Sequence, residues 1–187
     1  MSDMASLERR IAVLEDIEAI RKLKHRYFFV CDRKRPADVL ACFAPGEVRI
    51  DYGRVGQFSR AADMVAVFTA LACQEHIVEM HHAQNEQIEI LDATRAEATW
   101  GLYYFMINTR ERTVTQLGGY YLDEYRKIDG EWKISATAYH VTSTELLDLG
   151  EGMAKVIFAG GAAPAIRPFT SCAMPSRRPA GALISML

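Results

Sequence analysis

The chain has 187 residues, of which 50% are hydrophobic and 25% are charged. This length and composition are typical of one globular domain with a full apolar core and argue against a second domain. The formal net charge of −2 at pH 7 provides no broad basic surface for nucleic acid or for an anionic membrane. We therefore expect the partners to be small molecules or further copies of the chain.

The N-terminal segment is charged and has helical periodicity, and it lacks the apolar region and cleavage site of a signal peptide. No apolar run approaches the roughly 18 residues that a membrane-spanning helix needs. The four cysteines are scattered without CxxC spacing, which favours free thiols in a reducing compartment over a disulfide framework. Together these features predict a cytoplasmic protein.

The first half of the chain predicts three helices around one short strand. Apolar residues recur at steps of three and four over 7–30, which indicates a long amphipathic helix. A short helix is expected at 37–43 and a strand at 48–52, with proline and glycine between them. Ser59 is a suitable N-cap for a third helix at 60–73.

The second half predicts a run of strands, because its segments are rich in β-branched and aromatic residues. Asp129-Gly130 is the strongest hairpin turn in the chain. Helices followed by adjacent strands indicate an α+β domain, in which a curved, mostly antiparallel sheet and the helices on its concave side enclose a pocket. The expected strands are 81–91, 96–108, 113–127 and 131–142.

The end of the chain predicts a possible helix at 145–158 and then becomes rich in glycine, alanine and proline. We therefore divide the sequence into a domain over 1–145 and a C-terminal extension over 146–187. The extension is expected to be mobile, to form a flap over the pocket or to contact a partner subunit.

Three polar residues stand out in an otherwise apolar framework, because a tyrosine, a carboxylate and an imidazole can together transfer protons. Tyr27 and Asp32 lie near the end of the first helix, and His81 lies at the start of the strand run. Tyr27 and Asp32 would be about 140° apart on a continuous helix, but both can face one pocket if the helix frays at Cys31. The spacing alone is more typical of a core tyrosine and a solvated aspartate.

Strand alternation leaves the inward-facing histidine open. Adjacent strand residues point to opposite faces, so at most one of His81 and His82 faces the pocket. Strict alternation groups His82 with Ile88 and Ile90, but one bulge between Asn85 and Ile88 would reverse that assignment. A surface or structural role is the more common alternative for either histidine.

Alternation along the last strand places Trp132, Ile134 and His140 on one face. If the first two face the core, His140 lies on the pocket side. Aromatic residues of the central strands, among them Tyr104 and Tyr121, suit a pocket for a flat apolar ligand, although they are equally ordinary core residues.

No cofactor or metal is expected. The histidines lack the i, i+4 helical pairing of HExxH, and no carboxylate stands at a familiar ligand spacing. The Gly-Gly pairs are too isolated to form nucleotide-binding loops, and there is no nucleophile elbow.

Three segments have a familiar order of motifs: LEDIEAIRKLKHRYFFVCDRKRPADVLACFAPGEVRIDYG at 14–53, MHHAQNEQIEI at 80–90 and GGYYLDEYRKIDGEWKIS at 118–135. They contain a helix-end aspartate, a His-x3-Asn element and a Tyr-x3-Asp-Gly-x-Trp-x-Ile element. In this the chain resembles the SnoaL-like branch of the NTF2-like superfamily, which includes scytalone dehydratase, bile-acid 7α-dehydratase and hexachlorocyclohexane dehydrochlorinase. The resemblance implies an NTF2-like cone and one pocket that supports dehydration, dehydrohalogenation, isomerisation, cyclisation or plain binding.

The resemblance also implies roles for individual residues. Asp32 matches the family's helix-end aspartate, and His81, four residues before Asn85, matches its catalytic histidine, which favours His81 over its neighbour. Tyr27 falls where relatives carry a tyrosine or lysine. Tyr52 is similar to the tyrosine that activates water or a substrate carbonyl in scytalone dehydratase.

These matches imply a cofactor-independent lyase in which Asp32 orients His81, and His81 removes a proton from a substrate carbon. The leaving group would be water, halide or a small carbonyl fragment. Tyr27 and Tyr52, with His140 as a further candidate, would donate hydrogen bonds to a carbonyl or departing oxygen as charge develops. The expected substrate-binding residues are Tyr52, Asn85, Tyr104, Tyr121 and His140.

The sequence also departs from the family pattern. The arginine that several relatives carry on the last strand is absent, since Ser135-Ala-Thr-Ala-Tyr-His140 stands there, and the serine and asparagine of scytalone dehydratase fall near Gly119 and Tyr121. An isomerase or cyclase using the same base, or a non-catalytic binding or assembly module, therefore remains an alternative. We expect an aromatic or polycyclic small-molecule substrate and a homo-oligomer, either a dimer or a trimer.

Overall fold

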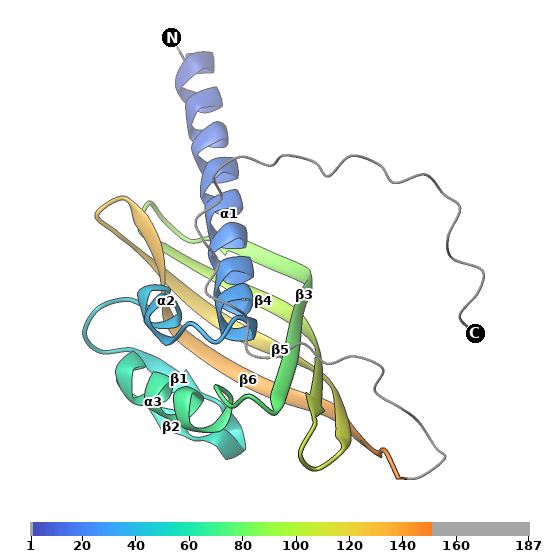
Figure 1. The fold of residues 1–187 in the computed structure, drawn as a ribbon. Helices are drawn as coiled ribbons and strands as arrows, with labels where there is room; N and C mark the ends of the chain where they lie inside the picture. Colours follow the sequence, from blue (N-terminus) through green and yellow to red (C-terminus); the bar gives the residue numbers. More distant parts are fainter. Residues whose placement is uncertain (1, 151–187) are drawn as a thin grey trace, which may run out of the picture.

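The computed structural model describes residues 2–150, in which one long helix and two shorter ones lie against a curved sheet (Figure 1). The helices are α1 (Ser2–Asp32), α2 (Pro36–Ala41) and α3 (Ala61–Leu71), with a 3-10 turn η1 (Gly53–Val55). The strands are β1 (Arg49–Asp51), β2 (Gln57–Phe58), β3 (Ile77–Ile90), β4 (Arg95–Asn108), β5 (Thr113–Ile128) and β6 (Glu131–Asp148).

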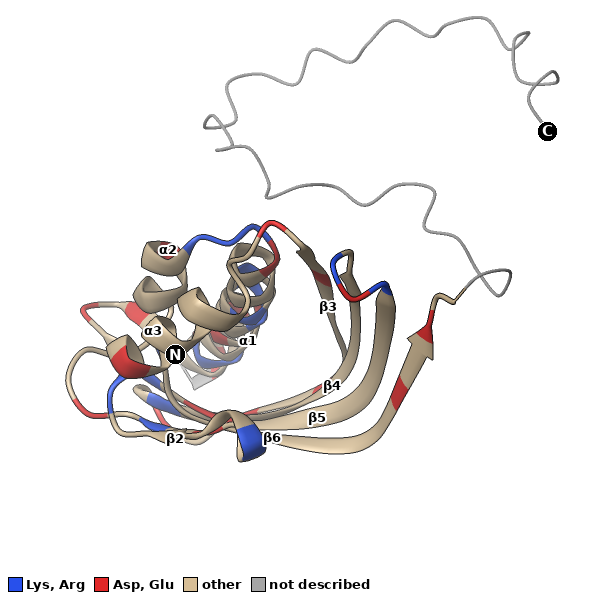
Figure 2. Cartoon of the chain, turned by 60° about the horizontal axis from the view of Figure 1, so that its bottom comes forward, with Lys and Arg blue, Asp and Glu red and all other residues tan. Residues whose placement is uncertain are grey.

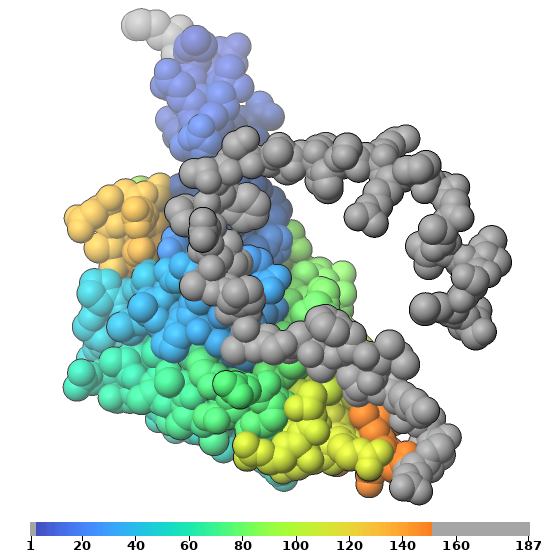
Figure 3. Space-filling model, in the orientation of Figure 1, coloured from blue at the N-terminus to red at the C-terminus, as the bar shows by residue number. Residues whose placement is uncertain are grey.

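The strands form one sheet in the order β2-β1-β6-β5-β4-β3, antiparallel except where β1 pairs with β6. The sheet curls without closing, and the three helices lie on its concave side (Figure 2). In the space-filling view, atoms of α2 and α3 cover part of the sheet (Figure 3). The predicted α+β cone is therefore confirmed. None of the helices within residues 2–150 is both long and apolar enough to cross a membrane.

Two expectations about the ends of the strands require correction. β3 begins at Ile77, four residues before the predicted start, and β6 continues through Asp148. The prediction of a helix at 145–158 is therefore wrong at its start. Glu145 and the residues after it continue β6 and pair with the first residues of β5. Residues 151–158 lie outside the described part of the chain, as does most of the 146–187 extension, whose role stays a prediction.

The Asp129-Gly130 turn joins β5 to β6 as predicted. Ile128 pairs with Glu131 directly across it. Both turn residues have positive φ, 50° for Asp129 and 82° for Gly130, as a two-residue type I′ hairpin turn requires.

β3 contains a bulge that reverses its alternation. Gln84 pairs with Gly101 and Gln87 with Thr99, so two residues of β3 lie opposite the single residue Trp100. One of the two, Asn85, has a φ of 53°, a conformation that asparagine tolerates better than most residues. At this bulge the backbones come so close that a Cβ on Gly101 would lie 2.9 Å from the Gln84 carbonyl oxygen.

β6 contains a similar bulge at Ser135. Ile134 pairs with Tyr125 and Ala136 with Glu124, which leaves Ser135 as the extra residue. Its hydroxyl donates to the Glu124 carbonyl at 3.1 Å. As a result, the side chains from Ala136 to Val141, where the pairing shifts again, point to the faces opposite to those that strict alternation predicts.

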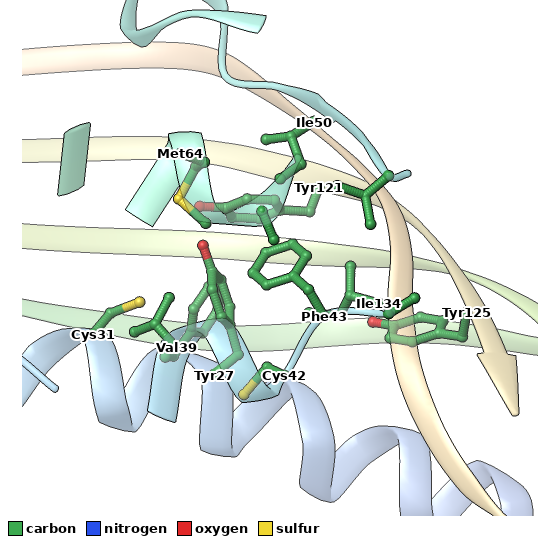
Figure 4. Packing of buried hydrophobic residues seen from close by; sticks show 14 of the residues in the cluster. Tyr27, Cys31, Val39, Cys42, Phe43, Ile50, Met64, Tyr121, Tyr125 and Ile134 are labelled. Atoms are coloured by element: carbon green, nitrogen blue, oxygen red, sulfur yellow. The ribbon is translucent and has the colours of Figure 1, made fainter. Parts of the chain in front are cut away.

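A buried ion pair lies between α1 and the sheet, within an otherwise apolar core whose packing is shown in Figure 4. Lys24 Nζ donates to Asp123 Oδ2 at 2.7 Å, and both side chains are completely buried. The hydroxyl of Tyr125 donates to the same oxygen at 2.7 Å and accepts a hydrogen bond from Trp100 at 2.9 Å. Burial lowers the pKa of Lys24, and the Asp123 carboxylate opposes that shift.

We predict that Lys24→Met strongly destabilises the protein, because it leaves the Asp123 carboxylate buried without its cation. Removing one partner of a buried pair costs about 3–5 kcal/mol, so the free energy of unfolding measured by urea denaturation should fall by about that amount. Lys22→Met is the matched control, since the Lys22 side chain on the same helix is 75% exposed. Its effect should stay within about 0.5 kcal/mol, and equal losses in the two variants would contradict the prediction.

Candidate functional site

A cavity of about 290 Å³ lies between the helices and the concave face of the sheet. Much of its wall is aliphatic or aromatic, and the wall includes Val39, Val55, Met64, Val67, Phe68, Leu71, Leu102 and Leu117. Its polar side chains are Tyr27, Tyr52, Glu79, His81, Tyr104, Tyr121 and Tyr139. A mainly apolar cavity with a few convergent polar groups is typical of small-molecule sites.

A larger and more open groove, of about 1190 Å³, crosses the sheet on the side that faces away from the helices. Many of its side chains are charged or amide groups, such as Glu97, Glu124 and Gln87. None of the predicted site residues lines it. The smaller cavity is therefore the candidate site.

The end of α1 brings the Asp32 carboxylate against His81 of β3. Asp32 Oδ1 lies 2.6 Å from His81 Nδ1, and Asp32 Oδ2 accepts the backbone N–H of His81 at 3.2 Å. The carboxylate thus contacts both the ring and the backbone of the same residue, which fixes the orientation of the imidazole. With Nδ1 directed at the carboxylate, Nε2 is the ring nitrogen left for chemistry.

Aromatic rings surround the imidazole and limit its contact with water. Phe28 stacks on His81 with 5.2 Å between centroids and an interplanar angle of 22°, and Tyr104 lies 4.8 Å away. Only 15% of the His81 side chain is exposed, and 17% of the Asp32 side chain. Shielding of this kind strengthens the electrostatic interaction of the pair with any group in the cavity.

The bulge in β3 decides which histidine faces the cavity. His81 points inward together with Ile88 and Ile90, a combination that strict alternation excludes. His82 is exposed on the opposite face, where its ring lies 6.1 Å from that of Tyr103.

Two tyrosine hydroxyls meet at the cavity wall, one from α1 and one from the residue after β1. Tyr27 Oη and Tyr52 Oη are 2.7 Å apart, and either can be the donor. Because one proton lies between the two oxygens, the pair retains one further hydroxyl proton as a donor. Burial raises the pKa of both groups well above the ordinary tyrosine value, so both are neutral donors.

Two further tyrosines line the cavity from neighbouring strands, Tyr121 on β5 and Tyr139 on β6. Their rings lie 4.9 Å apart. Burial raises the pKa of Tyr121 well above its usual range and that of Tyr139 to about 12. The Lys24 ammonium lies 3.8 Å from the centroid of the Tyr121 ring, so a cation sits behind this part of the wall.

A carboxylate on the cavity wall, Glu79, was missed by the sequence reasoning. It forms an ion pair with Lys34 and accepts a hydrogen bond from the Tyr104 hydroxyl at 2.8 Å. Glu79 lies two residues before His81, so alternation alone would have put both on one face. The signal was overlooked because the predicted strand began at residue 81.

Two of the predicted substrate-binding residues do not line the cavity. Asn85 is exposed and belongs to the β3 bulge. His140 is exposed on the outer face, where it stacks on Tyr120 at 4.9 Å, while its neighbour Tyr139 lines the cavity. The predicted orientation of His140 is wrong because the bulge at Ser135 shifts the alternation by one residue. Among the described residues, no group of three or more His, Cys, Asp or Glu side chains could hold a metal ion.

Comparisons with known proteins identify the family and the fold. The sequence model of the SnoaL-like domain matches residues 12–138. A structure from Novosphingobium aromaticivorans with the provisional name scytalone dehydratase is 21% identical, with a TM-score of 0.67 over 84% of this chain and 98% of that one. A hexachlorocyclohexane dehydrochlorinase from Novosphingobium barchaimii is 14% identical, with a TM-score of 0.68 over 79% and 98% of the two chains. At these identities the structures show a shared fold.

The raised tyrosine pKa values predict a loss of stability at alkaline pH. In the unfolded chain a tyrosine ionises near pH 10, whereas six of the eight tyrosines keep their protons to higher pH in the folded state. Their contribution to stability is therefore complete below about pH 10 and is lost as the pH rises further. The six are Tyr27, Tyr52, Tyr104, Tyr121, Tyr125 and Tyr139.

Ultraviolet difference spectroscopy and circular dichroism along one alkaline titration would test this. Most of the tyrosinate absorbance should appear together with the loss of the folded signal, at a pH above about 10. Ionisation of all the tyrosines near pH 10 in a protein that is still folded would contradict the prediction.

Proposed function

The chain belongs to the SnoaL-like domain family, and on that premise we propose that it is a cofactor-independent lyase of the dehydratase type. The observation that carries the proposal is the 2.6 Å contact between Asp32 and His81 at the wall of a mainly apolar cavity. The names of the structural relatives denote loss of water and loss of hydrogen chloride, which supports an elimination. The substrate would be a small, largely apolar molecule with an acidic C–H bond.

His81 is the base in the proposed reaction. Its Nδ1–H group donates a hydrogen bond to Asp32. Its Nε2 atom accepts a proton from the carbon next to a substrate carbonyl. The Asp32 carboxylate stabilises the imidazolium that results. The electron pair of the broken C–H bond forms a carbon–carbon double bond as the leaving group on the next carbon departs with its own bonding pair. When the leaving group is hydroxide, the imidazolium returns the proton and water is released.

The tyrosines act on the substrate oxygen in this scheme. As the proton leaves, negative charge develops on the carbonyl oxygen, and the free hydroxyl proton of the Tyr27–Tyr52 pair can donate to it. Because burial keeps both groups neutral, they add no negative charge to the cavity. A positioned base contributes about 10²–10⁴-fold to the rate, so orientation and oxyanion stabilisation must supply the remainder.

We predict that His81→Asn and Asp32→Asn each lower proton abstraction by at least about 10²-fold while the circular dichroism spectrum is unchanged. The measurement is the enzyme-dependent exchange of the α-protons of α-tetralone in D₂O, followed by NMR. This bicyclic ketone has an acidic carbon and no leaving group, so the assay reports the base alone. His82→Ala is the matched control, because His82 is the exposed neighbour on the same strand. This variant should catalyse the exchange at the wild-type rate.

The β-hydroxy derivative of α-tetralone tests the complete elimination, because loss of water converts it to fluorescent α-naphthol. Wild-type protein should release α-naphthol, and the His81 and Asp32 variants should not. Exchange without release of α-naphthol would favour an isomerase or cyclase that uses the same base. Undiminished exchange in both variants would rule out the Asp32–His81 pair as the base.

A further inference from the structure

The end of α1 and the turn after it present two charged side chains to β3, those of Asp32 and Lys34. Arg35 N–H donates to the Val30 carbonyl at 3.0 Å and Lys34 N–H to the Cys31 carbonyl at 2.9 Å, the hydrogen bonds of a Schellman motif. Lys34 occupies the left-handed position of that motif, with a φ of 54°, where glycine is usually found. The turn thereby reverses the chain directly after Asp32.

Two pairs of side chains therefore join the same turn to the same strand. Asp32 contacts His81, and Lys34, two residues later, contacts Glu79, two residues earlier on β3. Residues two apart on a strand lie on one face, about 7 Å from each other. The two pairs are thus adjacent, and the Glu79 carboxylate and the His81 ring both face the cavity.

Glu79 is the only carboxylate among the described residues that line the cavity, whereas Lys34 does not line it. Their side chains are 5% and 8% exposed, so the charge of Glu79 is shielded from solvent and balanced by Lys34 from behind. A buried ion pair contributes little net stability compared with apolar residues of similar size. Stability alone therefore does not explain a carboxylate on the wall of an otherwise apolar cavity.

The Glu79 carboxylate has accepting capacity to spare. Lys34 donates to Oε1 and the Tyr104 hydroxyl donates to Oε2, while an ionised carboxylate has about four lone-pair sites. The two donors hold the group in place, and the remaining sites can accept hydrogen bonds from within the cavity. An O–H or N–H group of a bound ligand could therefore donate a hydrogen bond to Glu79.

We propose that Glu79, held by Lys34 and Tyr104, determines substrate specificity by accepting a hydrogen bond from a hydroxyl group of the ligand. This inference rests on the proposed function in one respect, since it takes His81 as the group that faces the reacting carbon. Because the two positions on β3 are about 7 Å apart, the recognised hydroxyl would lie several bonds away from that carbon. The substrate class is then a cyclic ketone with a hydroxyl on the far side of its ring system.

The test compares the dissociation constants of α-tetralone, its phenolic derivatives and the corresponding methyl ethers by isothermal titration calorimetry. The wild type should bind at least one neutral phenolic derivative about tenfold or more tighter than α-tetralone, as expected for a hydrogen bond to a charged acceptor. The methyl ether has the same shape without the donor and should bind no better than α-tetralone. In Glu79→Gln the preference for the phenol should fall several-fold, because the neutral amide oxygen is a weaker acceptor than the carboxylate.

Two control variants and one further test variant make the result specific. Glu89→Gln changes an exposed carboxylate on the same strand outside the cavity and should keep the preference. Lys34→Met should weaken the preference several-fold, because Lys34 donates to one oxygen of Glu79 and holds the carboxylate in place; it serves as the second variant if Glu79→Gln does not fold. His81→Asn should keep the preference, which separates recognition by Glu79 from the base.

The absence of a preference in the wild type, or an unchanged preference in Glu79→Gln or Lys34→Met, would overturn the proposal. Equal affinities for the phenol and its methyl ether would do the same, because the donor would then not be recognised. Failure of the elimination assay with the phenol preference intact would instead count against the lyase and leave the Glu79 site standing.

Discussion

The buried ion pair between Lys24 and Asp123 fixes α1 on the sheet, and the candidate site depends on that placement. A fully buried lysine cannot leave its partner without a large desolvation cost, so the pair sets both the rotation of the helix and its position along β5. Tyr27 follows Lys24 by three residues, which keeps it on the same helix face, and Asp32 lies where the helix ends. A shift of one helical residue would move both groups away from His81 and Tyr52.

The second constraint is set by the bulges at Asn85-Glu86 of β3 and at Ser135 of β6, each of which adds one residue to a strand. Without the bulge in β3, an inward His81 would require Ile88 and Ile90 to face water, and the apolar side of the strand would be divided between two faces. Without the bulge at Ser135, the strand that buries Ile134 would direct His140 rather than Tyr139 into the cavity. The bulges also bend the strands that carry them, which contributes to the curl of the sheet around the cavity.

The sequence predicts the helices, the hairpin at Asp129-Gly130 and the order of elements, because these depend on periodicity and on local turn chemistry. The bulges have no such pattern, since a bulge is decided by how two strands pair. Asn85 is informative in this respect: it was expected to contact substrate, but its residue type suits the left-handed backbone of the bulge. Glu79 and Lys34 are distant in sequence, and only the turn after α1 brings them together. The helix expected at 145–158 failed at its start because pairing with β5 outweighs local helical preference.

The charges around the cavity are arranged in pairs, which bears on the kind of molecule that it can hold. Asp32 faces an imidazole, Glu79 faces Lys34 and Asp123 faces Lys24, so each carboxylate has its own partner close by. The tyrosines, whose pKa values are raised by burial, supply hydrogen bonds without adding charge. Desolvation of an ionic ligand would be costly, and the residues that line the cavity in the described part of the chain offer it no unpaired counter-ion, whereas a neutral ketone loses little on entry. Charge that develops only during proton transfer would then interact strongly with groups that are already oriented, which favours the transition state over the ground state.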